Sequence, residues 1–257
     1  MLRFALAWHD MDGAAGGVGV AMARARLTLL DAFGLVCDDE PVALPMTAQR
    51  VLAFVALHDR PLHRLYVAGS LWLDSPEERA YASLRSALWR LHRNGRQFVA
   101  TDGQQLALGR DVEVDLRESE ALARRALDKS DPDALGVDAS ALSADLLPDW
   151  YEDWVLIERE RYRQVRLRAL DALCDRLTQA NRLGEALDAG LAAVAGEPLR
   201  ESAHRAVVRV HIAEGNVGEA IRQYRLCRRL LNEQLGIEPS ERMHELVRSL
   251  DVPETVR

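Results

Sequence analysis

Apolar and polar residues alternate in short runs near the start of the chain, a pattern typical of β-strands. The runs Arg26–Leu30, Phe33–Cys37 and Val42–Leu44 are separated by clusters of aspartate, glutamate and proline, which favour turns. They predict a small antiparallel sheet. Residues 1–25 are expected to be a disordered leader or the result of a wrongly assigned start codon, because two aspartates interrupt the apolar run that a signal peptide requires.

The apolar spacing changes to the helical period after Pro45. A first helix follows with Thr47 as its expected N-cap, and a second, short helix is predicted over Arg64–Leu71. The third helix has the clearest start, because Ser75 can cap it and proline suits the first helical position that follows. This helix is expected to end near Arg93.

A β-hairpin is predicted directly after the third helix. The strand-like runs Phe98–Thr101 and Gln105–Leu108 flank Asp102–Gly103, a dipeptide that favours tight turns. One more strand is expected at Val112–Val114. A small sheet, three helices and a hairpin are the parts of a winged helix, so residues 26–114 are interpreted as a winged-helix domain.

Strand patterns are absent from Asp115 to the end, which indicates an all-helical second half over residues 115–250. Asp115 is interpreted as the start of a capping box that opens a helix to about Lys129. A loop and a long helix at about Glu152–Ala180 are expected next. The fold class is therefore mainly α, with an α+β winged helix-turn-helix ahead of a helical domain.

The helical half contains an internal repeat. Gly184–Leu187 recurs as Gly218–Ile221, an offset of 34 residues. This is the period of tetratricopeptide helical hairpins, in which each hairpin packs on the next. A last helix at about Glu241–Leu250 follows Pro239, so a short tetratricopeptide-like superhelix is predicted.

Composition narrows the class of protein. Hydrophobic residues make up 48% of the chain and charged residues 28%, values typical of a globular protein. No apolar run is long enough to span a membrane. Cys37, Cys174 and Cys227 are far apart and lack metal-ligand spacing, so they are interpreted as small buried residues and a reducing cytoplasm is the expected location.

The net charge of −7 is unevenly distributed. Residues 24–114 contain as many acidic as basic residues, and the excess of acidic residues lies beyond Asp115. Between Arg79 and Thr101, five arginines occur without a single acidic residue. This segment includes most of the third helix and is a candidate surface for binding an anion.

A helical wheel divides the third helix into two faces. Leu84, Leu88 and Leu91 fall together on an inward face. The opposite face and its flanks contain arginines, which can pair with guanine or phosphate, and serines, which hydrogen-bond to either. The alternative is that these arginines are only solvated and bind nothing. The position of the helix, the lack of carboxylates in this segment and the adjacent hairpin disfavour it. The candidate DNA-contacting residues are Arg79, Ser83, Arg85, Ser86, Trp89, Arg90, Arg93, Arg96 and Gln104.

Three of these candidates have open alternatives. Trp89 is expected first to pack against the edge of the sheet, with stacking on a sugar or a protein contact as alternatives. Arg96 and Gln104, before and within the hairpin, either contact phosphate or are ordinary polar loop residues.

Motifs for catalysis and for cofactors are not present in the sequence. It contains no glycine-rich phosphate loop, no nucleophile elbow and no zinc-protease motif, and the histidines do not pair at ligand spacing. No catalytic residue, metal ligand or cofactor is therefore assigned, and the chain is not expected to be an enzyme.

The chain resembles the bacterial antibiotic-pathway regulatory proteins, in which an OmpR/PhoB-type winged helix precedes a bacterial transcriptional activation domain. The segments with this resemblance are Leu71–Glu77, Ser83–Leu91, Glu197–Arg205, Ala213–Asn216 and Leu235–Ser240.

The resemblance implies a transcriptional activator. Such a protein binds double-stranded DNA at promoter direct repeats, often as side-by-side copies that form a homodimer on the DNA, and recruits RNA polymerase. It also implies that the third helix, Pro76–Arg93, is the recognition helix. The alternative is a protein-interaction adaptor whose winged helix no longer binds DNA, which the neutral charge of residues 24–114 favours.

Overall fold

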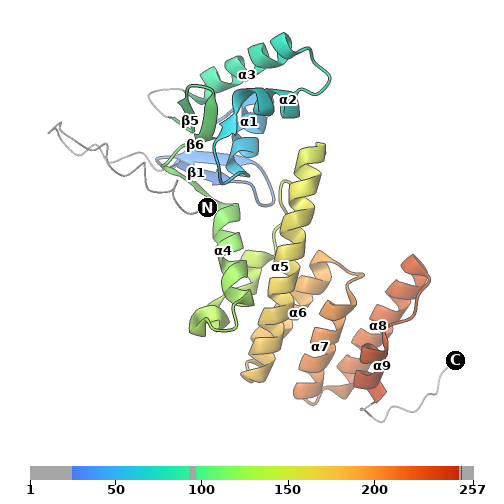
Figure 1. Ribbon diagram of the computed structural model, residues 1–257. Helices are drawn as coiled ribbons and strands as arrows, with labels where there is room; N and C mark the ends of the chain where they lie inside the picture. The colour runs from blue at the N-terminus through green and yellow to red at the C-terminus, as the bar shows by residue number, and fades with distance from the viewer. Residues whose placement is uncertain (1–24, 93–96, 249, 251–257) are drawn as a thin grey trace.

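The computed structural model describes residues 25–92, 97–248 and 250. The predicted leader lies outside these residues except for Ala25, which already belongs to the first strand. The described chain forms a unit of two small sheets and three helices, followed by a longer array of helices (Figure 1). The mainly helical fold class is confirmed.

The first sheet has the strand order β3-β2-β1-β7. Its strands are β1 (Ala25–Thr28), β2 (Gly34–Cys37), β3 (Glu40–Pro41) and β7 (Val112–Val114). The first three pair antiparallel, as predicted for the first two, whereas β7 pairs parallel to β1.

The expected third strand at Val42–Leu44 is wrong. Pairing ends at Pro41, and Val42 makes one further backbone hydrogen bond, to Leu35 at 2.8 Å, before the chain turns into the first helix.

The three helices of this unit are α1 (Met46–Ala56), α2 (Arg64–Leu71) and α3 (Glu77–Leu91). The predicted caps Thr47 and Ser75 are both wrong. The N-cap residues are Pro45 and Pro76, each with an extended backbone, and neither helix start receives a side-chain hydrogen bond. Proline has a fixed φ and disfavours helix in the residue before it, so each helix starts directly after a proline.

The second sheet has the order β4-β6-β5 and connects the hairpin to α2. Its strands are β4 (Leu62–His63), β5 (Val99–Asp102) and β6 (Gln105–Leu108). Asp102 pairs with Gln105, so the turn residues are Gly103 and Gln104, one position later than predicted. Gly103 has φ +54°, a conformation that residues with a side chain rarely adopt.

The helical half comprises α4 (Asp115–Leu127), α5 (Asp153–Gln179), α6 (Leu183–Gly196), α7 (Glu201–Ala213), α8 (Val217–Leu235) and α9 (Glu241–Arg248). Two short 3₁₀ helices, Pro132–Gly136 and Ala139–Leu142, lie in the loop before α5. Helices α5 to α8 pack successively side by side (Figure 1). This is the predicted tetratricopeptide-like array, and α6 and α8 begin with the two copies of the repeat.

Asp115 connects the two halves, although it is not the N-cap of α4. The N-cap is Val114, whose side chain makes no cap hydrogen bond, while the Asp115 carboxylate accepts from the backbone N–H of Leu116 in the first turn at 2.7 Å. The Asp115 carboxylate accepts hydrogen bonds from the backbone N–H of Leu29 at 2.9 Å and of Leu30 at 3.1 Å, beyond the end of β1. Burial raises the pKa of this carboxyl, and the backbone donors act against the rise.

The first hydrophobic core crosses the predicted domain boundary at Asp115. It includes Trp150 and Val155 together with residues of the first sheet and of α1 to α3. The Trp154 ring meets that of Phe54 edge-on at a centroid distance of 5.2 Å, and Arg50 Nε lies 2.9 Å from a Glu152 carboxylate oxygen. The start of α5 is therefore packed directly on α1.

The three cysteines are buried, as predicted. Burial raises the pKa of the Cys174 thiol to about 12 and that of Cys227 to about 11, so both remain protonated near neutral pH. Among the helices of the described residues, none combines the length and the apolar character needed to cross a membrane.

Asp115→Asn tests the link between β1 and α4. Asparagine retains one acceptor oxygen but places an amide donor against a backbone N–H, so we expect a loss of about 1–3 kcal/mol in the free energy of unfolding. Denaturant unfolding measures this loss. The control is Asp111→Asn at an exposed position, and an equal effect of both substitutions would remove Asp115 from this role.

A second test concerns the pH dependence of stability and uses His204. This residue of α7 is fully buried on the side that faces α8. Its Nε2 lies 2.9 Å from the Pro198 carbonyl oxygen and its Nδ1 lies 2.8 Å from Gln223 Nε2, so the neutral ring satisfies both contacts. Burial lowers the pKa of His204 below the ordinary value of 6.5.

Because the folded state holds this histidine neutral, its contribution to stability is present above about pH 6.5 and is lost as the pH falls below that value. Unfolding midpoints at pH 7.5 and pH 5.5 should therefore differ more in the wild type than in His204→Asn. The variant His92→Asn, changed at an exposed position, should keep the wild-type difference.

Candidate nucleic-acid interface

One face of α3 is buried against α1 and α2. The inward face predicted by the helical wheel is confirmed, because Leu84, Leu88 and Leu91 are at most 5% exposed. Ala80 and Ala87 complete this buried face. Burial of three leucines fixes the rotation of the helix about its axis, and the opposite face must then point to solvent.

The exposed face contains the predicted residues that the structure describes. Arg79, Arg85, Ser86, Trp89 and Arg90 are exposed, and Ser83 at the flank is half-buried. Arg93, and Arg96 before the hairpin, lie outside the described residues. The small side chain of Ala82 is exposed on the same face.

The first expectation for Trp89 is wrong. Its side chain is 78% exposed and does not pack against the edge of the sheet. The reason is the position of the apolar stripe: once the leucines turn inward, a residue at this place on the wheel projects away from the protein body. The alternatives of a sugar or a protein contact stay open as predictions.

The arginines of α3 have no carboxylate partner among the described residues. Arg79, Arg85 and Arg90 form neither an ion pair nor a side-chain hydrogen bond with any of them. Other arginines are paired: Arg26 with Glu113, Arg50 with Glu152 and Arg117 of α4 with Asp59. Three guanidinium groups therefore remain available to an external anion.

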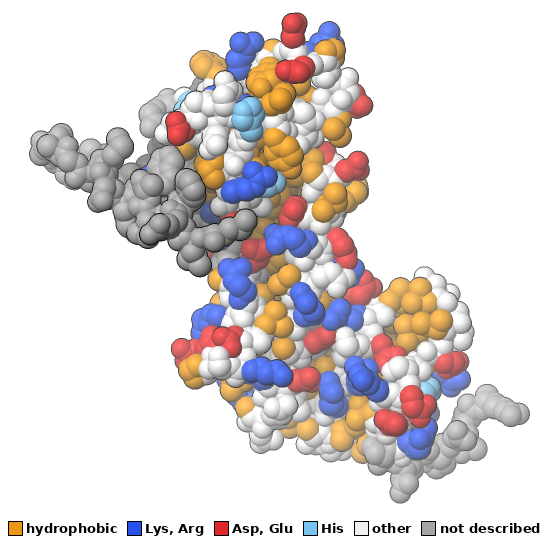
Figure 2. Space-filling view, in the orientation of Figure 1, with side chains coloured by type: hydrophobic (Ala, Val, Ile, Leu, Met, Phe, Trp, Pro, Cys, Tyr) orange, Lys and Arg blue, Asp and Glu red, His pale blue; other side chains and the backbone are white. Residues whose placement is uncertain are grey.

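The helical half does not cover α3. The helix lies on the side of its unit remote from α6 to α9 (Figure 1). On the visible face of the helical half, basic and acidic side chains are mixed (Figure 2). Many of its arginines are paired with carboxylates, such as Arg200 with Asp171 at 2.9 Å and Arg209 with Asp175 at 2.8 Å.

Gln104 lies at the turn of the hairpin and is exposed, so its side chain can reach an external ligand.

Glu77 and Glu78 occupy the first turn of α3, where they interact favourably with the helix dipole. Carboxylates therefore lie at the N-terminal end of the helix, and the described arginines extend from Arg79 to Arg90.

Arg64 and Tyr81 are site residues that the sequence analysis missed. Both line an opening that also includes Arg85 and Gln104. Arg64 is the first residue of α2, and its sequence position gives no indication of α3 because the packing of α2 on α3 and the pairing of β4 with β6 bring the two together. Tyr81 lies between the two faces of the helical wheel, so neither face included it.

The geometry of this surface suits a polyanion better than a small catalytic centre. Among the described residues, no group of three or more His, Cys, Asp or Glu side chains is placed to hold a metal ion. The surface consists of a convex helix with guanidinium and hydroxyl groups, next to a hairpin. These groups can donate hydrogen bonds to phosphate oxygens and to guanine in a major groove.

The family comparison matches the second half of this chain. The model of the family described as "Bacterial transcriptional activator domain" matches residues 111–250, which include β7 and helices α4 to α9. A search of curated proteins found no match.

A solved structure with a similar fold is that of Mycobacterium tuberculosis EmbR, determined in complex with a low affinity phosphopeptide. The sequences are 19% identical, and the TM-score is 0.69. The match covers 89% of this chain and 65% of the EmbR chain. At this identity the likeness establishes the shared fold alone, including the N-terminal unit that the family model does not cover.

Arg85→Ala and Arg90→Ala test whether these arginines take part in holding the fold together. Since neither side chain has a partner among the described residues, each substitution should change the free energy of unfolding by no more than about 0.5 kcal/mol. Arg50→Ala, which removes an ion pair and a hydrogen bond to the Leu71 carbonyl, should cost about 1–3 kcal/mol. A comparable loss in all three variants, measured by denaturant unfolding, would contradict the assignment.

Proposed function

Because this chain belongs to the bacterial transcriptional activator domain family, we propose that it is a sequence-specific DNA-binding transcriptional regulator, with α3 as its recognition helix. The family is regulatory, and the proposal includes no catalytic step. The DNA-contacting residues are Arg79, Ser83, Arg85, Ser86, Trp89, Arg90, Arg93, Arg96 and Gln104.

The observation that supports this proposal most is the set of unpaired arginines on the exposed face of α3. Exposed arginines usually gain little from ion pairs within the protein, but a row of them without carboxylates produces a local positive potential. Duplex DNA has a phosphate every few ångströms, and neutralising these phosphates releases counterions. Arginine and serine side chains on one helix can in addition contact base edges.

The rest of the proposal follows from the resemblance to antibiotic-pathway regulators. The protein binds promoter direct repeats as side-by-side copies, recruits RNA polymerase and activates neighbouring genes in the cytoplasm. The tetratricopeptide-like helices α6 to α9 supply the surface for protein contacts, because stacked helical hairpins expose extended faces. The winged helix over residues 26–114 and the helical domain over residues 115–250 act as the two functional parts.

Genome-wide mapping first identifies a binding site of the protein. The experiment then measures the affinity of the full chain for a fluorescent duplex of that sequence. The wild type should lose affinity steeply as salt rises. Arg90→Ala should weaken binding by about 1–3 kcal/mol if it contacts a base, or lower the salt slope by about one if it contacts phosphate. Arg85→Ala should likewise either weaken binding as a lost base contact or lower the salt slope as a lost phosphate contact.

The matched control is Arg225→Ala, at an exposed arginine of α8 that lies in the helical half. It removes the same charge and should leave both the affinity and the salt slope unchanged. Unchanged binding in both α3 variants would remove this helix from the interface.

The second candidate function is a protein-interaction adaptor whose winged helix no longer binds DNA. The carboxylates of Glu77 and Glu78 at the start of α3 favour this adaptor function, because their negative charge would repel a nearby DNA phosphate. The two candidates differ in one result: an adaptor shows no salt-dependent binding to any duplex in the same titration.

A further inference from the structure

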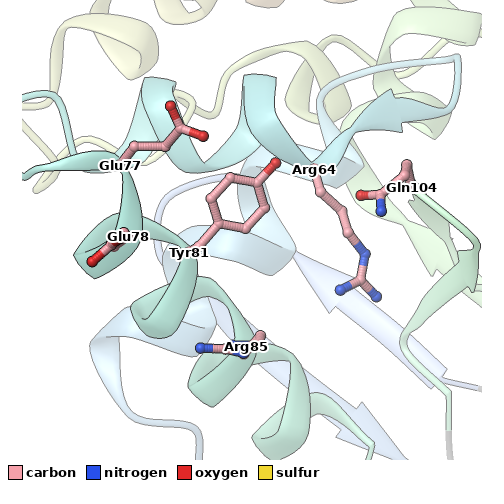
Figure 3. Close-up of a pocket in the computed structure, with 6 residues that line it drawn as sticks. All are labelled: Arg64, Glu77, Glu78, Tyr81, Arg85 and Gln104. Atoms are coloured by element: carbon pink, nitrogen blue, oxygen red, sulfur yellow. The ribbon is translucent and has the colours of Figure 1, made fainter.

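A recess of about 660 Å³ opens between the start of α2, the first half of α3 and the turn of the hairpin. We refer to it as the α2–α3 opening. The residues that line it are Arg64, Glu77, Glu78, Tyr81, Arg85 and Gln104. Figure 3 shows the Tyr81 ring between Glu77 and Arg64, with Arg85 on the next turn of α3.

The backbone holds Arg64 firmly in place. Its N–H donates to the Gln104 carbonyl oxygen at 2.8 Å, and the preceding residue, His63, pairs with Gln105 in the second sheet. The guanidinium group, by contrast, has no partner among the described residues. Its Nε is buried and lacks any hydrogen bond, a state that costs free energy unless a ligand supplies the acceptor.

The charges around the opening are divided. Two arginines and two glutamates line it, so its formal charge is zero and an anion is attracted only where the arginines lie closer than the carboxylates. Figure 3 shows the Arg64 side chain extending past the Tyr81 ring, with Arg85 on the turn of α3 below that ring. Glu77 lies beyond the Tyr81 ring from Arg64 in this view.

We propose that the arginine side of the α2–α3 opening binds one backbone phosphate of the DNA duplex, with Arg64 as its principal ligand. Arg85 and the Tyr81 hydroxyl donate to the same phosphate, and Gln104 contacts it from the hairpin. This inference rests on the proposed function and adds a contact outside the recognition face of α3. It assigns Arg64 a role in fixing the position of the protein on the duplex.

A phosphate suits this place for three reasons. A guanidinium group can donate two parallel hydrogen bonds to phosphate oxygens. A second guanidinium and a phenol add donors from another helix. One backbone hydrogen bond joins the start of α2 to the hairpin turn, so the residues around the ligand are held in fixed positions. Contacts to phosphate position a protein on the duplex without selecting a base sequence.

The experiment compares Arg64→Ala with Arg60→Ala in the full chain. Both substitutions remove one arginine near the start of α2, but Arg60 is exposed, lies over the Tyr66 ring and does not line the opening. Arg64→Ala should weaken binding by about tenfold at moderate salt, equally for the cognate duplex and for an unrelated one, and lower the salt slope by about one. Arg60→Ala should leave affinity and slope near the wild-type values.

Two further variants keep the test decisive if Arg64→Ala fails to fold. Tyr81→Phe retains the ring but removes the hydroxyl, and should weaken binding by about twofold to fivefold at an unchanged salt slope. Glu77→Gln should strengthen binding, because it removes the charge that repels the phosphate. Glu77→Gln could instead weaken binding, and only for duplexes that contain one particular base pair. Glu77 would then contact that base pair, and the phosphate assignment would be wrong.

Failure of this inference differs from failure of the proposed function. If the wild type binds DNA with the expected salt dependence while Arg64→Ala matches Arg60→Ala, the phosphate site is wrong and the recognition helix stands. If the wild type binds no duplex at all, both are wrong. Far-UV circular dichroism of each variant shows that it is folded before binding is measured.

Discussion

Burial of the leucine face of α3 is the constraint on which the proposed interface depends. Leu84, Leu88 and Leu91 are removed from water against α1 and α2, and each buried leucine stabilises the fold by roughly 1.5–3 kcal/mol. Any rotation of the helix that brought the arginines inward would lose this burial and require unpaired charges to leave water. The exposed position of Arg85, Trp89 and Arg90 is therefore a consequence of hydrophobic packing on the opposite side.

The connection between the two halves keeps this face free. Asp115 binds backbone N–H groups beyond the end of β1, while Trp150 and Trp154 extend the first core to the start of α5. These contacts attach the helical array to the sheets and to α1, not to α3. A partner bound to α6–α9 and a duplex bound to α3 would therefore not compete for the same surface (Figure 1).

Pairing of charges distinguishes the surfaces of the protein. In the helical half, ion pairs such as Arg200–Asp171 stabilise contacts between neighbouring helices. On α3 the arginines have no such partners among the described residues, and Arg64 has a buried Nε without an acceptor. A charged group without a partner in the protein is more readily explained by an external ligand, and the arginine side of the α2–α3 opening, across the Tyr81 ring from Glu77, gives that ligand a defined place.

The sequence by itself determined most of the elements and the orientation of α3, because local spacing fixes helical periods and the 34-residue repeat. It also singled out Arg79, Arg85 and Arg90, since a helical wheel needs no knowledge of distant residues. Only the tertiary structure decided the parallel pairing of β7 with β1, the role of Asp115 and the proximity of Arg64 to α3. Each of these depends on residues far apart in the chain, where packing of the whole domain outweighs local preference. The misplaced caps show the same limit, because a shift of one or two residues at a proline is decided by the backbone path and not by the capping motif.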